Sequence, residues 1–520
     1  MALKRPTLED FANIAAQYGL GLSTHDLEVI HTTLGPTIQG FELLDQWEAA
    51  SAPKVTPRDP GFSPSVEDNP YGAWYWKAAI EGAASGPLAG KTIAIKDNVA
   101  VAGLPLTNGS RLLRTFVPRE DATVVQRILQ AGGTIGGKAV CENLCFSGSS
   151  FTSDSGPVRN PYDPTRSAGG SSSGSAVLVA IEEVDMAIGG DQGGSIRIPA
   201  SWCGIYGLKP TWGLVPYTGA FPIEPTLDHL GPMAGTVQDL AQLLEVIVGP
   251  DGSDPRQMMI PEGVSVGYSK ALGQSLAGLR IGIVQEGFAW PQSDPAVDEM
   301  VRTQVQRLEQ LGVQVQTISI PLHRQAMAIW NGIGIEGTLN TMMLGNAYGS
   351  GWKGRYDPEL MQTWGDTWRE QASDLPPTVK QLILMAEYLR SQSSGRYYGI
   401  AQNMASALTE AYDRAMAAVD LLVMPTLPMV ASALPAADAP LEDVFERAFE
   451  MLHNTAPFDV TGHPAITIPI GMEAGLPVGL MAIAPKFAEG QLIRLASGIE
   501  QHVFKPSKPQ MIDKARVKNG

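Results

Sequence analysis

Hydrophobic positions alternate between strand-like and helix-like patterns over most of the chain. Short apolar runs typical of buried strands occupy residues 92–95, 184–188, 279–284, 313–320, 421–424, 465–470 and 478–483, and a further strand starts at 134–135. Apolar residues at helical spacing lie between them, at 122–130, 176–181, 240–248, 297–308 and 490–500. This alternation predicts an α/β fold with a central mixed β-sheet covered by helices on both faces.

Two stretches depart from this alternation. Near the start, Leu8, Phe11 and Ile14 recur at helical spacing, which predicts an N-terminal helical extension, and a proline-rich connector covers residues 53–70. Residues 322–418 also have a mostly helical pattern and interrupt the strands. We therefore expect four parts: a helical segment at 1–75, a first core part at 76–320, a helical insertion at 321–420 and a second core part at 421–520.

Composition narrows the function classes. The 520 residues include 37 Lys and Arg against 53 Asp and Glu, a net charge of −16, which argues against a nucleic-acid partner held by phosphate neutralisation. The charged start is unlike a signal peptide, and no apolar stretch is long enough to span a membrane. Three cysteines fit a reducing compartment better than a disulfide framework, so we expect a cytoplasmic protein.

Two turns rich in glycine and serine, at residues 169–175 and 189–195, carry the candidate chemistry. One precedes the expected helix at 176–181 and the other follows the expected strand at 184–188, so their hydroxyl groups could meet at one site. Residues 170–174 match the G-x-S-x-G elbow with Ser172 as nucleophile, but an elbow needs a strand directly before it. Residues 161–167 are polar and broken by prolines, which rules this interpretation out.

Cys141 and Cys145 form a C-x3-C pair, which could place two metal ligands on one helical face. No His or Cys pair follows at the spacing of a zinc site. We therefore expect no metal and interpret the two thiols as buried groups near the active site.

Three motifs in order, GGSSSGSA, GGDQGGSIRIPA and GLKPTWGLVP, resemble the amidase signature family of serine hydrolases. The similarity extends upstream to Lys96 in GKTIAIKDNVAVAG and downstream to MPTLP and NTAPFDVTGHPAITIPIG. It implies the fold of that family and a cofactor-free amidase, which converts a carboxamide to a carboxylic acid and ammonia or an amine.

The resemblance also implies the catalytic roles. Ser195 would be the nucleophile that carries the acyl group, and Ser171, preceded by a cis peptide bond, would bridge it to the base Lys96. Burial favours the neutral amine form of a lysine, which can then accept a proton. The expected oxyanion hole consists of the backbone N–H groups of Gln192, Gly193, Gly194 and Ser195.

Two residues differ from the commonest family pattern. Gln192 follows Asp191 where threonine is more frequent, and Ser173 replaces glycine. The Gln192 side chain could therefore add an amide to the substrate pocket, while Arg197 is expected to anchor the turn by an ion pair with Asp191.

The expected acyl pocket has an apolar wall. Phe146 occupies a family position that borders the substrate, and Trp330 and residues 445–452 lie in regions that vary with substrate. No cation is evident that would pair with a substrate carboxylate. The sequence thus favours a small uncharged carboxamide with an apolar or aromatic acyl group.

Other functions remain open on the same residues. An aryl acylamidase, a carbamate hydrolase or the amidase subunit of a tRNA-dependent amidotransferase would share the scaffold, and a non-catalytic binding scaffold belongs to a different class. The N-terminal helices resemble an extension seen at the dimer interface of amidases that work beside nitrile hydratase. We expect either a homodimer or a helical cap on the core.

Overall fold

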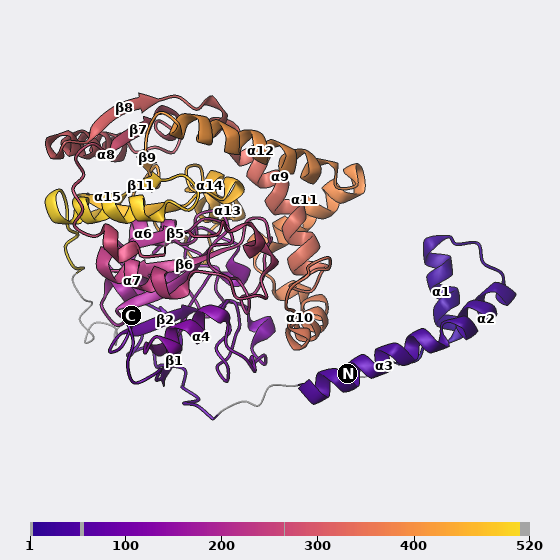
Figure 1. Ribbon diagram of the computed structural model, residues 1–520. Helices are drawn as coiled ribbons and strands as arrows, with labels where there is room; N and C mark the ends of the chain where they lie inside the picture. Colours follow the sequence, from indigo (N-terminus) through magenta and orange to yellow (C-terminus); the bar gives the residue numbers. More distant parts are fainter. Residues whose placement is uncertain (1–3, 52–56, 265, 510–520) are drawn as a thin grey trace. The chain divides into compact units, whose positions relative to one another are not determined.

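The computed structural model describes residues 4–51, 57–264 and 266–509, and the chain forms two compact units, Met1–Thr56 and Pro57–Gly520 (Figure 1). Part of the expected connector, residues 53–56, lies outside the described residues. Residues 321–420 lie within the second unit, and the finer division of that unit stays a prediction.

The first unit contains the helices α1 (Leu8–Tyr18), α2 (Thr24–Thr33) and α3 (Gly35–Ser51). Reciprocal hydrogen bonds between Thr7 and Asp10, and between Ser23 and Asp26, satisfy the free N–H groups at the starts of α1 and α2. Gly19 ends α1 in the left-handed conformation that glycine adopts without strain. The expected N-terminal helices are thus present in this unit.

The second unit is built on one mixed sheet, which among the described residues has eleven strands in the order β1-β3-β2-β4-β6-β5-β10-β11-β9-β7-β8. The strands are β1 (Trp74–Ile80), β2 (Thr92–Lys96), β3 (Thr134–Ala139), β4 (Met186–Asp191), β5 (Tyr206–Lys209), β6 (His229–Ala234), β7 (Arg280–Val284), β8 (Gln314–Ile318), β9 (Leu421–Pro425), β10 (Ala465–Glu473) and β11 (Leu476–Ile483). The pairs β2–β3, β2–β4, β7–β8 and β7–β9 are parallel and the others antiparallel. The predicted mixed sheet is confirmed.

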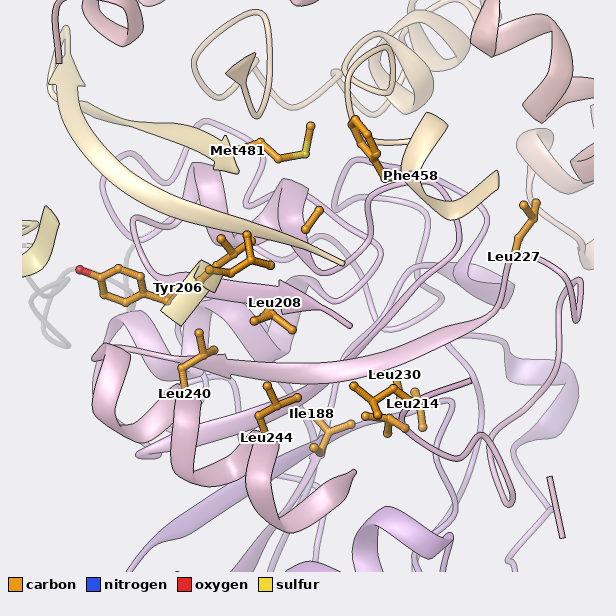
Figure 2. Packing of buried hydrophobic residues seen from close by; sticks show 14 of the residues in the cluster. Ile188, Tyr206, Leu208, Leu214, Leu227, Leu230, Leu240, Leu244, Phe458 and Met481 are labelled. Atoms are coloured by element: carbon orange, nitrogen blue, oxygen red, sulfur yellow. The ribbon is translucent and has the colours of Figure 1, made fainter. Parts of the chain in front are cut away.

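Helices of the second unit surround this sheet. They are α4 (Thr123–Gln130), α5 (Ser173–Ala180), α6 (Arg197–Trp202), α7 (Val237–Ile247), α8 (Pro295–Arg307), α9 (Ala326–Thr338), α10 (Pro358–Glu370), α11 (Pro377–Ser393), α12 (Arg396–Met416), α13 (Leu441–Phe449), α14 (Pro457–Thr461) and α15 (Glu489–His502). Figure 2 shows Leu244 of α7 beside Ile188 of β4 in the larger core cluster.

Alternate residues of β2 point to opposite faces of the sheet. Ile93 and Ile95 join the cluster that contains α4 and α7, whereas Ala94 packs in a second cluster with α5. Helices therefore cover both faces, as predicted. Lys96 shares the side of Ala94, so the strand period directs its side chain toward the start of α5, where Ser171 lies.

Within the described residues, no helix is long and apolar enough to cross a membrane.

Candidate active site

Lys96 and Ser171 are in direct contact. The Lys96 Nζ atom donates hydrogen bonds to Ser171 Oγ at 2.8 Å and to the carbonyl oxygen of Gly190 at 3.2 Å, and both side chains are fully buried. The peptide bond between Gly170 and Ser171 is cis, as the family resemblance implied. Strand β2 and the turn before α5 thus bring together two of the three expected catalytic residues.

Ser195 lies next to this pair through the backbone. The N–H of Ser172 donates to the carbonyl oxygen of Ser195 at 3.2 Å, which joins the two turns. The Ser195 residue is 7% exposed, and among the described residues its hydroxyl group has no hydrogen-bonding partner. Ser172 and Ser175 instead bond backbone groups of β4 and hold the turns in place.

Side chains from other parts of the fold hold the turn from Gln192 to Ser195 by hydrogen bonds to its carbonyl groups. The indole Nε1 of Trp330 donates to the Gln192 carbonyl at 2.7 Å, and the Thr455 hydroxyl donates to the Gly193 carbonyl at 2.6 Å. The Gly194 N–H donates to Asp191 at 2.5 Å, so this expected oxyanion donor fixes the turn instead. In the described part of the chain, the N–H groups of Gln192, Gly193 and Ser195 have no acceptor.

A buried ionic network lies behind the turn. The guanidinium of Arg197 contacts both carboxylate oxygens of Asp191 at 2.9 and 3.0 Å, which confirms the expected ion pair. It also donates to Asp459 at 2.8 Å and to the Thr455 carbonyl at 2.8 Å. Burial alone would raise the pKa of Asp191, but the charge of Arg197 holds it well below its ordinary value.

The other side of the turn has unpaired acceptors. Gln192 Nε2 donates to the Tyr217 hydroxyl at 3.1 Å, and Tyr217 donates to the Phe221 carbonyl at 3.3 Å. Among the described residues, the buried side-chain oxygens Gln192 Oε1, Asn98 Oδ1 and Asp228 Oδ1 lack a hydrogen-bonding partner. Burial raises the pKa of Asp228 to about 8. The sequence did not point to Tyr217 or Asp228.

The residues predicted for the acyl pocket lie in two places. Phe146 packs edge-on against Phe449, with ring centroids 5.9 Å apart, so it meets the expected segment 445–452. Phe445 of the same segment faces a different hollow, between α11 and α13. Trp330 contacts the oxyanion turn through its hydrogen bond to Gln192.

Two thiols line the Lys96 side of the site. The Sγ atoms of Cys145 and Cys141 donate to Asn108 Oδ1 at 3.1 and 3.7 Å. Burial raises the pKa of the Cys145 thiol, but Cys141, Lys96 and Ser171 together outweigh it and lower that pKa to about 7. Over the described ranges, no group of three His, Cys, Asp or Glu residues could hold a metal ion.

Comparison with known proteins identifies the family. The amidase family model matches residues 67–493. The enantioselective amidase of Rhodococcus rhodochrous is 45% identical over 507 residues, covering 96% of each chain. One of the glutamyl-tRNA(Gln) amidotransferase subunits of Halobacterium salinarum is 36% identical, and the match covers 82% of this chain and 99% of that one.

A solved structure agrees with these relatives. The native peptide amidase of Stenotrophomonas maltophilia is 31% identical, with a TM-score of 0.69, and the match covers 82% of this chain and 85% of that one. Both the sequence relatives and the fold therefore lead to one assignment. The chain belongs to the amidase signature family and is an amidase, a hydrolase that acts on carbon–nitrogen bonds.

Proposed function

We propose that the protein hydrolyses small uncharged carboxamides through an acyl-enzyme on Ser195. Lys96, in its amine form, receives the Ser195 proton through Ser171 as Ser195 attacks the carbonyl carbon. The same proton passes to the departing nitrogen as the C–N bond breaks, and water then hydrolyses the acyl-enzyme. The observation that carries this proposal is the buried 2.8 Å contact between Lys96 Nζ and Ser171 Oγ beside Ser195.

The oxyanion is held by the free N–H groups of Gln192, Gly193 and Ser195. Trp330 and Thr455 support this role because they bond the carbonyl groups of the same turn and leave its N–H groups unpaired. One such donor typically contributes about 3 kcal/mol to stabilisation of the transition state.

The catalytic assignment is tested by three alanine variants and a control. Ser195→Ala and Lys96→Ala should abolish turnover in a fold that stays intact, and Ser171→Ala should be slow because water can replace its relay. Ser175→Ala is the matched control, since this buried hydroxyl bonds only the Ile188 carbonyl. Normal kcat in Lys96→Ala would remove lysine from the mechanism, and activity in Ser195→Ala would show that Ser195 is not the nucleophile.

The substrate proposal depends on Phe146 and its contact with Phe449. Phe146→Ala should lower kcat/KM for aryl amides more than for acetamide or propionamide, because the larger acyl group loses more apolar contact. Equal losses across the panel would place Phe146 outside the pocket. Faster hydrolysis of succinamate than of benzamide would overturn the apolar pocket, and N-aryl amides and carbamates in the same panel test the aryl acylamidase and carbamate alternatives.

The amidotransferase alternative has less support. The Rhodococcus amidase matches 96% of this chain, whereas the Halobacterium protein matches 82%. We expect the isolated chain to hydrolyse benzamide without partner subunits. Hydrolysis confined to glutamine, or dependent on added subunits, would favour the amidotransferase assignment.

Assembly as a homodimer in the cytoplasm completes the proposal. In the first unit Phe41, Leu44 and Trp47 are exposed on α3, Trp47 by 59%, and such apolar side chains are typical of an interface. The thiols of Cys141, Cys145 and Cys203 are free, as expected in a reducing compartment. Sedimentation of the full chain and of Trp47→Ser distinguishes a dimer from a chain capped by its own helices.

A further inference from the structure

A second hollow adjoins the site across one residue, Tyr217. The Tyr217 hydroxyl accepts the hydrogen bond from Gln192 of the oxyanion turn, while the residue itself lines a small hollow with a cavity volume of about 50 Å³. Tyr348 and Trp352 add further aromatic walls, and Asp228, Asp254 and Arg256 are its buried charged residues. None of the catalytic residues named above lines this space.

Asp228 lines the hollow and has an acceptor atom without a partner among the described residues. The residue is 1% exposed, and its Oδ2 atom accepts a hydrogen bond from the Ile223 N–H at 3.1 Å. Its Oδ1 atom is buried and has no hydrogen-bonding partner among the described residues. A buried acceptor without a donor is costly, so a ligand that supplies an N–H group would be stabilised here.

Arg256 is the buried cation near Asp228: its charge opposes the effect of burial on the pKa of Asp228, and its guanidinium carbon lies 5.0 Å from the centroid of the Tyr217 ring. The guanidinium of Arg256 forms its ion pair with Asp254, with Nε 2.9 and 3.1 Å from the two carboxylate oxygens, and reaches only the backbone carbonyl of Asp228 at 2.8 Å. Glu224 is a second buried carboxyl group, and its proximity helps to raise the pKa of Asp228. At the rim, Arg355 is paired with Glu120.

We propose that this hollow binds a small organic ammonium ion, with Asp228 Oδ1 accepting an N–H bond and the rings of Tyr348 and Trp352 facing the cation. Aromatic faces attract ammonium groups, and the attraction strengthens where water is excluded. The identification of this cation as the amine product of hydrolysis rests on the proposed function. Tyr217 would then join the amine site to Gln192 at the reaction centre.

Binding is measured by ligand-observed NMR titration of propylammonium chloride at pH 8.5 and constant ionic strength in potassium chloride. At this pH most Asp228 is ionised and alkylammonium ions keep their proton. The neutral analogue 1-propanol tests for apolar binding alone. The titration is repeated on Ser195→Ala, which separates failure of this site from failure of the proposed catalysis.

We expect propylammonium to bind the wild type and Ser195→Ala alike, at least about tenfold more tightly than propanol. Asp228→Asn should weaken binding at least about tenfold, whereas the exposed control Asp438→Asn should not change it. If Asp228→Asn fails to fold, Trp352→Ala serves as the second variant and should weaken binding through loss of the ring. Absence of binding, equal binding of propanol, or unchanged affinity in the variant used would overturn the proposal.

Discussion

The two sides of the turn from Asp191 to Ser195 differ in how their polar groups are used. On the Arg197 side, the guanidinium bonds Asp191, Asp459 and Thr455, which leaves Asp459 Oδ1 as the buried oxygen of these groups without a hydrogen-bonding partner among the described residues. On the Tyr217 side, buried oxygens of Gln192 and Asp228 have no partner among the described residues. Both sides are buried, so exposure to solvent does not explain the difference.

The paired groups position the turn, whereas the unpaired acceptors are available to bind a ligand. Buried polar groups in folded proteins are nearly always hydrogen-bonded. A network in which these groups are paired fixes the positions of its side chains, whereas a buried acceptor without a partner can accept a hydrogen bond from a ligand. On the Arg197 side, Asp191 accepts the Gly194 N–H and Thr455 bonds the Gly193 carbonyl, so this side fixes the backbone of the turn. The Tyr217 side offers acceptors where the nitrogen of a substrate or product could bind.

The largest expected effect comes from breaking the paired side. Arg197→Met leaves the buried carboxyl groups of Asp191 and Asp459 without their cation, which should lower the free energy of unfolding by about 3–5 kcal/mol. Urea unfolding measures this loss. The control Arg414→Met removes an exposed arginine that pairs with Glu410 at 3.4 Å and should change stability little. Similar losses in both variants would contradict the role of the network.

The unpaired side should instead show itself in the pH dependence of stability. The pKa of Asp228 is raised from 3.8 to about 8 in the folded protein by burial, and Glu224 adds to this against the opposing charge of Arg256. Between these two pKa values, Asp228 is therefore protonated in the folded state and ionised in the unfolded state. The stabilisation is complete below about pH 3.8 and is lost as pH rises to about 8.

Asp228→Asn removes this titration. The unfolding free energy of the wild type minus that of the variant should fall as pH rises from 3.8 to about 8, by up to about 1.4 kcal/mol per pH unit. Urea unfolding of both proteins at several pH values gives the difference. A constant difference across this range would show that Asp228 keeps an ordinary pKa.

The features of the fold and the site that could be predicted from the sequence are those set by neighbouring residues in the chain. The apolar run before Lys96 predicted β2, and the strand period places its side chain on the face of α5. By contrast, β5 and β6 were not predicted, because glycine and proline interrupt the apolar pattern in HLGPMA and the lysine of YGLK is buried.

The supports of the turn could not be found in this way. Thr455 and Asp459 act on residues more than 250 positions earlier in the chain, and no local pattern marks such contacts. Tyr217 is one of 13 tyrosines, and only the fold places its hydroxyl beside Gln192. The motif NTAPFDVTGHPAITIPIG did contain Thr455 and Asp459, but the resemblance assigned them no role.

A smaller effect is expected from loosening the turn on its paired side. Thr455→Val keeps the shape of the side chain but removes the 2.6 Å hydrogen bond to the Gly193 carbonyl. The loss should lower kcat about tenfold, since about 1–3 kcal/mol is lost when a buried acceptor loses its donor. Thr426→Val is the control, because this buried hydroxyl bonds Thr467 and not the turn. A change in KM alone would assign Thr455 to substrate binding.

The smallest effect is expected from Tyr217→Phe, which removes the hydroxyl that anchors the Gln192 side chain at 3.1 Å. The Gln192 backbone stays fixed by Trp330, so kcat should hold while KM rises, with kcat/KM falling roughly fivefold for one lost neutral hydrogen bond. Steady-state kinetics with benzamide measure both constants. Tyr162→Phe, whose hydroxyl bonds the Ser507 carbonyl, is the matched control and should leave both unchanged. A fall in kcat as large as that of Thr455→Val would mean that the Tyr217 side also positions the turn, and the distinction between the two sides would fail.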